Sequence, residues 1–327
     1  MSKKIKQVKL IANPGSGDAS DRGKLLEEVV LTLKGLGLKV DVAIAKPKEK
    51  TIPIAQKAIK QGYKSIIAMG GDDTIEAVIR GIAGSKVRLG MIPVGTANNL
   101  AKSLGIPEDV KAACALIASG KFRKLDLGLA RIKGKKIPFF ELVMVGIGAA
   151  IYPEALRVSK GRLSKIKRLV EKTLQQKSTP KMTIKMDGES SIRLDSMLGI
   201  VSNVPLIGPN MLVDPDASLE DGLFDILIFP NMNKAQLIEY FAKTTNENSP
   251  EDGKIQRYRA RKMQIKSKPK LEVMADGVML GKGKVKIKVL PGALRVYAPE
   301  VGAGMEKPPI EAGENLPAPV APVVESA

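Results

Sequence analysis

The first third of the chain alternates short apolar runs with amphipathic segments of helical period, and this alternation restricts the fold more than any other feature of the sequence. Strand-like and helix-like segments that follow one another in this way predict a parallel sheet with helices on both of its faces. The predicted strands are residues 6–14, 38–45, 64–70 and 87–95, and the predicted helices are residues 22–37, 52–62, 73–84, 97–103 and 108–119.

Glycine-bearing turns follow three of these predicted strands. Their sequences are NPGSG (13–17), GGDDT (70–74) and GTANN (95–99). Such sheets bind ligands outside the carboxyl ends of their strands, where the N–H groups of a glycine turn approach phosphate oxygens and the next helix adds the positive end of its dipole. A single turn of this kind can be a plain strand terminus, but three at one sheet edge predict a site for a nucleoside triphosphate.

The pattern of the sequence changes near residue 126. Beyond it, alternating and wholly apolar segments recur between turn residues, and they predict a mostly antiparallel second domain that one basic helix interrupts at roughly 156–174. We expect domains over 1–126 and 127–292, a return of the chain to the first domain near 293–300, and a disordered tail over 301–327. The predicted strand segments are 138–148, 181–188, 195–203, 223–230, 270–277 and 284–290.

The composition excludes several classes of chemistry. The chain has no histidine and one cysteine, Cys114, which excludes Ser–His–Asp and Cys–His catalysis, internal disulfides and thiolate metal clusters. Acid–base or metal chemistry must therefore use carboxylates. The start of the chain has no signal-peptide pattern, and no uncharged stretch reaches the about 18 residues of a membrane span, so we expect a cytoplasmic protein.

The net charge of +19 indicates an anionic partner. Basic residues gather in the predicted helix at 156–174 and again over 254–270. We interpret them as a surface for peripheral contact with an anionic membrane, with a merely solvated face as the alternative. Nucleic acid is disfavoured, because only 3% of the residues are aromatic and single strands stack on aromatic side chains. The question of a homodimer stays open, because exposed strand edges of two copies can pair.

The glycine turns and three later segments occur in the order of a known motif series. The later segments are MIPVGTANNLAKSLGIP (91–107), LIGPNMLVDPDASLEDGLFDILI (206–228) and ADGVMLG (275–281). Over roughly residues 6–299 the chain resembles the diacylglycerol kinase catalytic domain family. The resemblance implies an α/β fold with ATP between a doubly wound N-terminal domain and a β-sandwich C-terminal domain.

The resemblance also implies a function. Members of this family use ATP and Mg²⁺ to phosphorylate the hydroxyl of diacylglycerol or a related membrane lipid. Two alternatives stay open, namely a kinase of a soluble alcohol or dinucleotide, and a catalytically silent homologue that binds a nucleotide or lipid.

Where the motifs match, the resemblance implies roles for individual residues. Asp276 would be the base that takes the proton from the lipid hydroxyl. Asp72 would also lie near the catalytic metal, and a structural magnesium would lie on the Asp221 carboxylate and the backbone carbonyls of Ser218 and Leu223. The nucleotide contacts would be Asn13, Ser16, Gly17, Gly70, Gly71, Asp72, Asp73, Thr74, Gly95 and Thr96.

The sequence departs from the family pattern at several positions. The family usually has glycine where Asp73 stands, Asn-Glu where Glu76 and Ala77 stand, aspartate at Asn99 and glutamate at Val278. Asp73 is either a replacement magnesium ligand or the N-cap of the following helix. Loss of the glutamate leaves either a slow kinase or a protein without activity, because a general base contributes about 10²–10⁴-fold to a rate.

Overall fold

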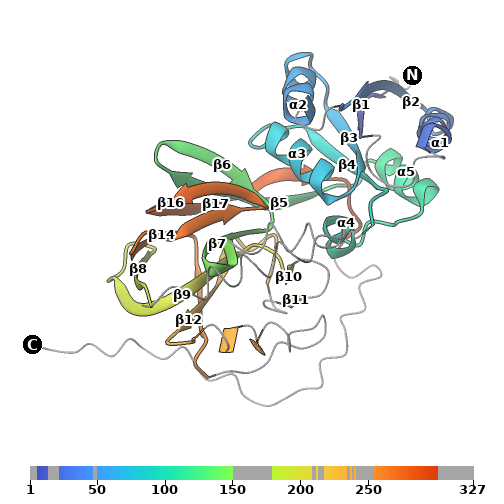
Figure 1. The fold of residues 1–327 in the computed structure, drawn as a ribbon. Coiled ribbons are helices and arrows are strands. Elements are labelled where there is room, and N and C mark those ends of the chain that lie inside the picture. The colour runs from blue at the N-terminus through green and yellow to red at the C-terminus, as the bar shows by residue number, and fades with distance from the viewer. Residues whose placement is uncertain are drawn as a thin grey trace, which may run out of the picture.

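The computed structural model describes residues 6–13, 22–46, 50–96, 98–149, 179–207, 211–212, 217–233, 236–237, 239–240 and 253–300. The predicted basic helix at 156–174 and the predicted tail at 301–327 lie outside the described residues. In Figure 1 a helix-flanked sheet continues into a second part that is rich in strands.

The N-terminal part is the predicted parallel sheet with helices on both faces (Figure 1). Its strands are β1 (Lys6–Ala12), β2 (Leu38–Ile44), β3 (Ser65–Gly70) and β4 (Arg88–Pro93), in the spatial order β4-β3-β1-β2. Its helices are α1 (Arg22–Gly35), α2 (Thr51–Lys60), α3 (Asp72–Ile82), α4 (Asn99–Ser103) and α5 (Val110–Ser119). The apolar periodicity located these elements to within a few residues.

Each face of this sheet has its own core. Ala55 of α2, Val78 of α3 and Leu100 of α4 are buried together in the core on one face. Leu33 of α1 and Cys114 of α5 are buried in the core on the other. Burial raises the pKa of the Cys114 thiol to about 11, so this cysteine is a packing residue at neutral pH.

The C-terminal part is an antiparallel β-sandwich. One layer contains β6, β5, β17, β14 and β8, the other contains β16, β15, β7, β9, β12 and β13, and β9 bends from one layer into the other. Phe139 and Phe224 stack between the layers, with ring centroids 5.5 Å apart. The strands are β5 (Arg123–Ile132), β6 (Lys135–Phe139), β7 (Leu142–Gly146), β8 (Lys181–Met186), β9 (Ile192–Ser202), β10 (Leu206–Ile207), β11 (Met211–Leu212), β12 (Phe224–Pro230), β13 (Gln256–Ala260), β14 (Lys262–Lys268), β15 (Glu272–Ala275), β16 (Val278–Lys282) and β17 (Val285–Val296).

Strand β17 joins the two parts. It pairs antiparallel with β14 and β5, and at its end Arg295 and Val296 pair in parallel with Arg88 and Leu89 of β4. The hydrogen-bonded sheet is therefore continuous from one part to the other. The domain boundaries at residues 126 and 292 stay predictions.

The sequence pattern did not indicate six of the observed strands, namely β5, β10, β11, β13, β14 and β16. Strands β13 and β14 lie in the basic stretch 254–270, where alternate residues are charged and exposed while Ala260, Met263 and Ile265 are buried. Among the described residues, no helix combines the length and apolarity that a membrane crossing requires.

Candidate active site

The turns after β1 and β3 meet in space. The side-chain amide of Asn13 donates to the Thr74 hydroxyl at 3.1 Å, and the Asn13 backbone N–H donates to the carbonyl of Met69 at 3.1 Å. The first residue of the turn NPGSG is therefore fixed against GGDDT, as the sheet-edge argument predicted. Residues 14–21 lie outside the described part of the chain, and with them the predicted contacts Ser16 and Gly17.

The turns after β3 and β4 meet even more closely, through two glycines. A Cβ atom on Gly95 would lie 2.5 Å from the Cα of Gly71, and a Cβ on Gly71 would lie 3.3 Å from the Cα of Gly95. The backbones pass so near each other that neither position accepts a larger residue without displacement. Asn13 and the turns after β3 and β4 thus converge at one edge of the sheet, beside the N-terminus of α3.

Asp72 and Asn98 hold this edge in shape. One carboxylate oxygen of Asp72 accepts the N–H of Leu100 at 3.0 Å, which ties the start of α3 to α4. Asn98 is buried with a φ of 53°, and its amide oxygen accepts the Gly95 N–H at 2.9 Å while its amide nitrogen donates to the Gly95 carbonyl at 3.0 Å. We did not predict Asn98, although an asparagine two residues after Gly-Thr is typical of such a left-handed turn position.

Two of the predicted contacts are more exposed than the half-buried Gly71 and Gly95. Thr96 is exposed, and Asp73 is exposed in the first turn of α3. The N-cap of α3 is Gly71, so the interpretation of Asp73 as the N-cap is wrong. A carboxylate in the first turn still stabilises the helix through its dipole. Its role as a magnesium ligand stays a prediction.

Asp276 lies in the buried turn between β15 and β16 and is bound by backbone amides. It is 5% exposed, and its φ is 39°. One of its oxygens accepts the N–H of Phe140 at 2.6 Å, and the other accepts those of Glu141 at 3.1 Å and Leu142 at 2.9 Å. The carboxylate therefore anchors the segment that enters β7, and of its four acceptor positions one is left for a proton.

Two glutamates from different parts of the chain interact electrostatically with Asp276. Glu141 is 8% exposed, and Glu76 of α3 pairs with Arg80 at 3.3 Å. Burial raises the pKa of both carboxyls well above its ordinary value, and the negative charge of Asp276 adds to the shift in each. Burial also raises the pKa of Asp276, against the three amide bonds that lower it. Because only Asp276 accepts those bonds, the ionised carboxylate is best placed there and the proton on Glu141.

Asn203 and Asp126, which sequence reasoning missed, connect this turn to the loop 217–223. Asn203 donates to the carbonyls of Phe140 at 2.9 Å and Asp126 at 3.2 Å. The carboxylate of Asp126 accepts the N–H of Gly222 at 2.7 Å and of Gly292 at 2.7 Å. These bonds join positions far apart in the sequence, so no local pattern could have indicated them.

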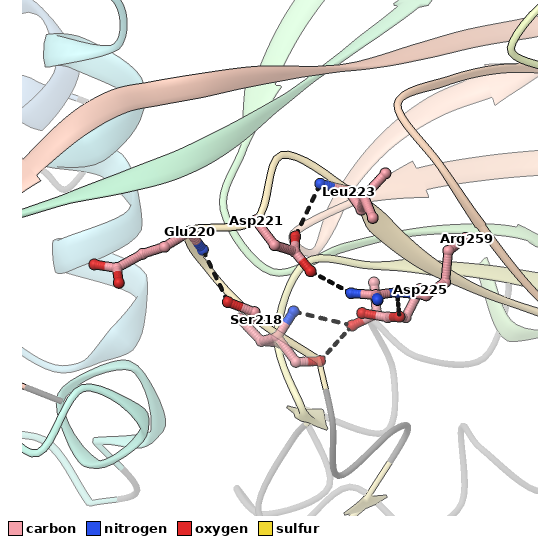
Figure 2. A network of polar contacts seen from close by, with 8 residues as sticks. Ser218, Glu220, Asp221, Leu223, Asp225 and Arg259 are labelled. Carbon is pink, nitrogen blue, oxygen red and sulfur yellow. Dashed lines mark hydrogen bonds and ion pairs between the residues drawn. The ribbon is translucent and has the colours of Figure 1, made fainter. Parts of the chain in front are cut away.

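The predicted structural magnesium ligands lie in this loop. Figure 2 shows the Asp221 carboxylate turned toward the Leu223 N–H, which donates to it at 2.9 Å, and toward the guanidinium of Arg259, which forms an ion pair with it. Arg259 also donates to Asp225 at 3.0 Å. Both oxygens of Asp221 are thus engaged, and this donor set does not fit a magnesium ion unless Arg259 moves away. Ser218 lies in the same loop, where its hydroxyl accepts the Glu220 N–H at 3.2 Å.

The nucleotide edge, by contrast, fits a polyphosphate. The glycine turns of Gly71 and Gly95 lie at the start of α3, where amide donors and the helix dipole favour phosphate. The Asp72 carboxylate begins the same helix, and a carboxylate beside a polyphosphate is the usual protein ligand of Mg²⁺. No group of three or more acidic or cysteine side chains among the described residues is arranged as a metal site on its own.

Comparisons with known proteins give the same two parts. Residues 7–130 match the diacylglycerol kinase catalytic domain, and residues 141–298 match the YegS C-terminal NAD kinase beta sandwich-like domain. A diacylglycerol kinase of Staphylococcus aureus is 28% identical over 308 residues, which cover 90% of this chain and 93% of that protein. A diacylglycerol kinase of Bacillus subtilis is 27% identical over 281 residues, with 84% and 90% covered.

A solved structure supports the fold. A diacylglycerol kinase from Bacillus anthracis superimposes with a TM-score of 0.70 at 22% identity, over 91% of this chain and 98% of that one. The matched domains lie in the order that the motif series predicted, with a nucleotide-binding domain before a β-sandwich. The chain therefore belongs to the lipid kinase family in which a diacylglycerol kinase catalytic domain precedes a YegS-type β-sandwich domain.

Proposed function

We propose that this protein transfers the γ-phosphoryl group of ATP to the hydroxyl of diacylglycerol or a related lipid alcohol, with Mg²⁺. The observation that carries the proposal is the position of α3. Its N-terminus lies at the converging glycine turns, and its next turn carries Glu76, whose carboxyl is near Asp276 and Glu141 of the sandwich. We infer from this position that phosphate donors and the predicted base serve one site between the two parts of the chain.

In this proposal the chain's own groups position the reactants and neutralise their charge. The hydroxyl oxygen bonds to the γ-phosphorus, the bond from that phosphorus to the β–γ bridging oxygen breaks, ADP leaves, and the hydroxyl proton passes to the open acceptor position of Asp276. Magnesium would neutralise phosphate charge from the side of Asp72. A protonated Glu141 keeps one negative charge away from the incoming triphosphate, because two like charges about 5 Å apart repel by roughly 3 kcal/mol at an effective dielectric of about 20.

The edge strand beside Asp276 favours a lipid over a soluble acceptor. Val278 and Met279 of β16 are large apolar side chains that are 36% and 44% exposed. They follow directly after the turn of Asp276 and Gly277, so they offer an acyl chain an apolar contact next to the predicted base. Val278 occupies the place of the family's glutamate and therefore adds apolar surface where the family has charge.

Transfer of radiolabelled γ-phosphate to a lipid extract in detergent micelles tests this function. Wild type should label a lipid, and Asp276→Asn should reduce the rate by about 10²–10⁴-fold. Asp187→Asn is the matched control, because Asp187 also has a positive φ before glycine but is exposed. Equal label in wild type and Asp276→Asn would exclude Asp276 as the base.

Two other results would redirect the proposal. Label only in a water-soluble alcohol or dinucleotide, without lipid, would favour the soluble-substrate kinase. ATP binding by calorimetry without any transfer would favour the silent homologue.

A further inference from the structure

The outer face of the sandwich layer β6-β5-β17-β14-β8 carries a row of cations in register. Lys136 pairs with Arg131, Arg131 with Lys286, Lys286 with Gln264, and Gln264 with Lys185. Directly paired residues of antiparallel strands project on the same face of a sheet. One line across five hydrogen-bonded strands therefore presents four positive charges and one amide.

Further cations flank this row on the same face. Lys262 pairs with Lys288, and Lys288 pairs with Leu129. On the other side of the row, Lys266 pairs with Thr183 and Thr183 with Arg193. All eight of the cationic residues are exposed, whereas the residues between them in each strand are buried in the sandwich core. We call these residues the cationic face: Arg131, Lys136, Lys185, Arg193, Lys262, Lys266, Lys286 and Lys288.

The centre of the cationic face is hollowed. A pocket of about 370 Å³ lies there, lined by Leu129, Met263 and Ile287 as well as by the cations. Asp187 also lines it, but its two oxygens accept the backbone N–H groups of Arg261 at 3.0 Å and Lys262 at 2.8 Å. Asp187 is the one carboxylate among the described residues of the pocket lining, and within that part of the chain it is bound to the backbone and pairs with none of the cations.

Repulsion within the cationic face destabilises the folded sheet, and a bound anion relieves this repulsion. Like charges directly opposite each other in a sheet destabilise it, since their side chains stand about 5 Å apart. Among the residues that the structure describes, none of the eight forms an ion pair. Arg259 of the neighbouring strand β13, by contrast, is paired with Asp221 and Asp225. The basic stretch 254–270 therefore does not form one surface, because its cations divide between two layers.

We propose that the cationic face docks the protein on the anionic phospholipid headgroups of a bilayer. The five strands are spaced about 4.8 Å apart, so the charges spread over a width of several headgroups rather than around one small ligand. The lining of the pocket offers the cations of Lys185, Lys262 and Lys286 to a single headgroup phosphate. The choice of a bilayer over another polyanion rests on the proposed lipid acceptor.

Co-sedimentation of the full chain with vesicles tests the docking. Wild type should bind vesicles that contain phosphatidylglycerol and release them at high salt. It should not bind vesicles of phosphatidylcholine alone. The triple variant Arg131→Gln, Lys185→Gln and Lys286→Gln should bind about 100-fold more weakly, because each cation near an anionic bilayer contributes about fivefold. It should also melt at or above the wild-type temperature, because the substitutions relieve repulsion.

A matched triple variant separates position from net charge. Lys39→Gln, Lys57→Gln and Lys111→Gln remove three exposed lysines from the N-terminal part and should weaken binding by less than about fivefold. Equal losses in both variants, or equal binding of wild type to neutral vesicles, would overturn the proposal. So would a gel shift in which the cationic face binds duplex or single-stranded DNA while anionic vesicles are not bound.

The docking proposal and the proposed function are tested independently of each other. Phosphoryl transfer in detergent micelles needs no bilayer, so the cationic-face variant should retain wild-type transfer there. Vesicle binding without any transfer by wild type would refute the kinase and leave the docking surface. Transfer in micelles without vesicle binding would refute the docking surface and leave the kinase.

Discussion

Removal of the Asp276 carboxylate should destabilise the protein by several kcal/mol. In Asp276→Ala the N–H groups of Phe140, Glu141 and Leu142 lose their acceptor inside the protein. Each unsatisfied buried group costs about 1–3 kcal/mol, which sums to roughly 3–9 kcal/mol, and alanine at a φ of 39° adds about 1–2 kcal/mol. A loss near 5 kcal/mol is comparable to the whole stability of many domains, about 5–15 kcal/mol.

Asp276→Asn should cost less. Its amide oxygen can keep the two bonds from Glu141 and Leu142, and asparagine tolerates a left-handed φ. Its NH₂ group then faces the N–H of Phe140, so one charge-assisted bond is lost, at about 1.5–3 kcal/mol. Asp276→Asn, and not Asp276→Ala, is therefore the variant in which lost transfer reports on the chemistry.

Urea unfolding followed by far-ultraviolet circular dichroism measures these differences, since the chain has no tryptophan. Asp187→Ala is the control, because Asp187 has a φ of 43° and accepts two backbone N–H groups but is exposed. Water replaces its bonds, so it should lose only about 1–2 kcal/mol. The reasoning is refuted if Asp276→Ala loses no more than Asp187→Ala, or no more than Asp276→Asn.

Three further predictions concern the glycine turns, the acidic pair and the loop of Figure 2. Gly95→Ala places a Cβ 2.5 Å from the Cα of Gly71, so calorimetry should show ATP affinity reduced at least about tenfold and stability reduced by about 1–3 kcal/mol; unchanged affinity would separate the turn from the nucleotide. Glu141→Gln should flatten the fall of melting temperature with pH. The raised folded-state pKa of Glu141 gives stability that is complete below the ordinary value of 4.5 and is lost as pH rises through the folded value. An equal slope in both proteins would contradict the burial of a protonated Glu141. Wild-type melting should not respond to chelator, whereas Arg259→Gln should melt lower and recover with Mg²⁺, because Asp221 then lacks its cation; a chelator-sensitive wild type would show that a metal holds this loop.

The sequence by itself determined the parallel sheet and one edge of the site. Periodicity and turn chemistry are local, so β1, α1 and their successors could be located from runs of a few residues. The convergence of the glycine turns followed from topology, because parallel strands place their carboxyl ends together. The family motifs added Asp276 and the loop of Asp221 as candidates.

Only the tertiary structure decided what surrounds these candidates. The bonds of Asp276 span 134 to 136 positions in the sequence, and the proximity of Glu141 depends on the same fold. The cationic face depends on strand register, because a shift of one residue would turn each lysine into the core. Basic residues that are scattered along the chain therefore become one surface only through pairings over long sequence distances, which no local pattern records.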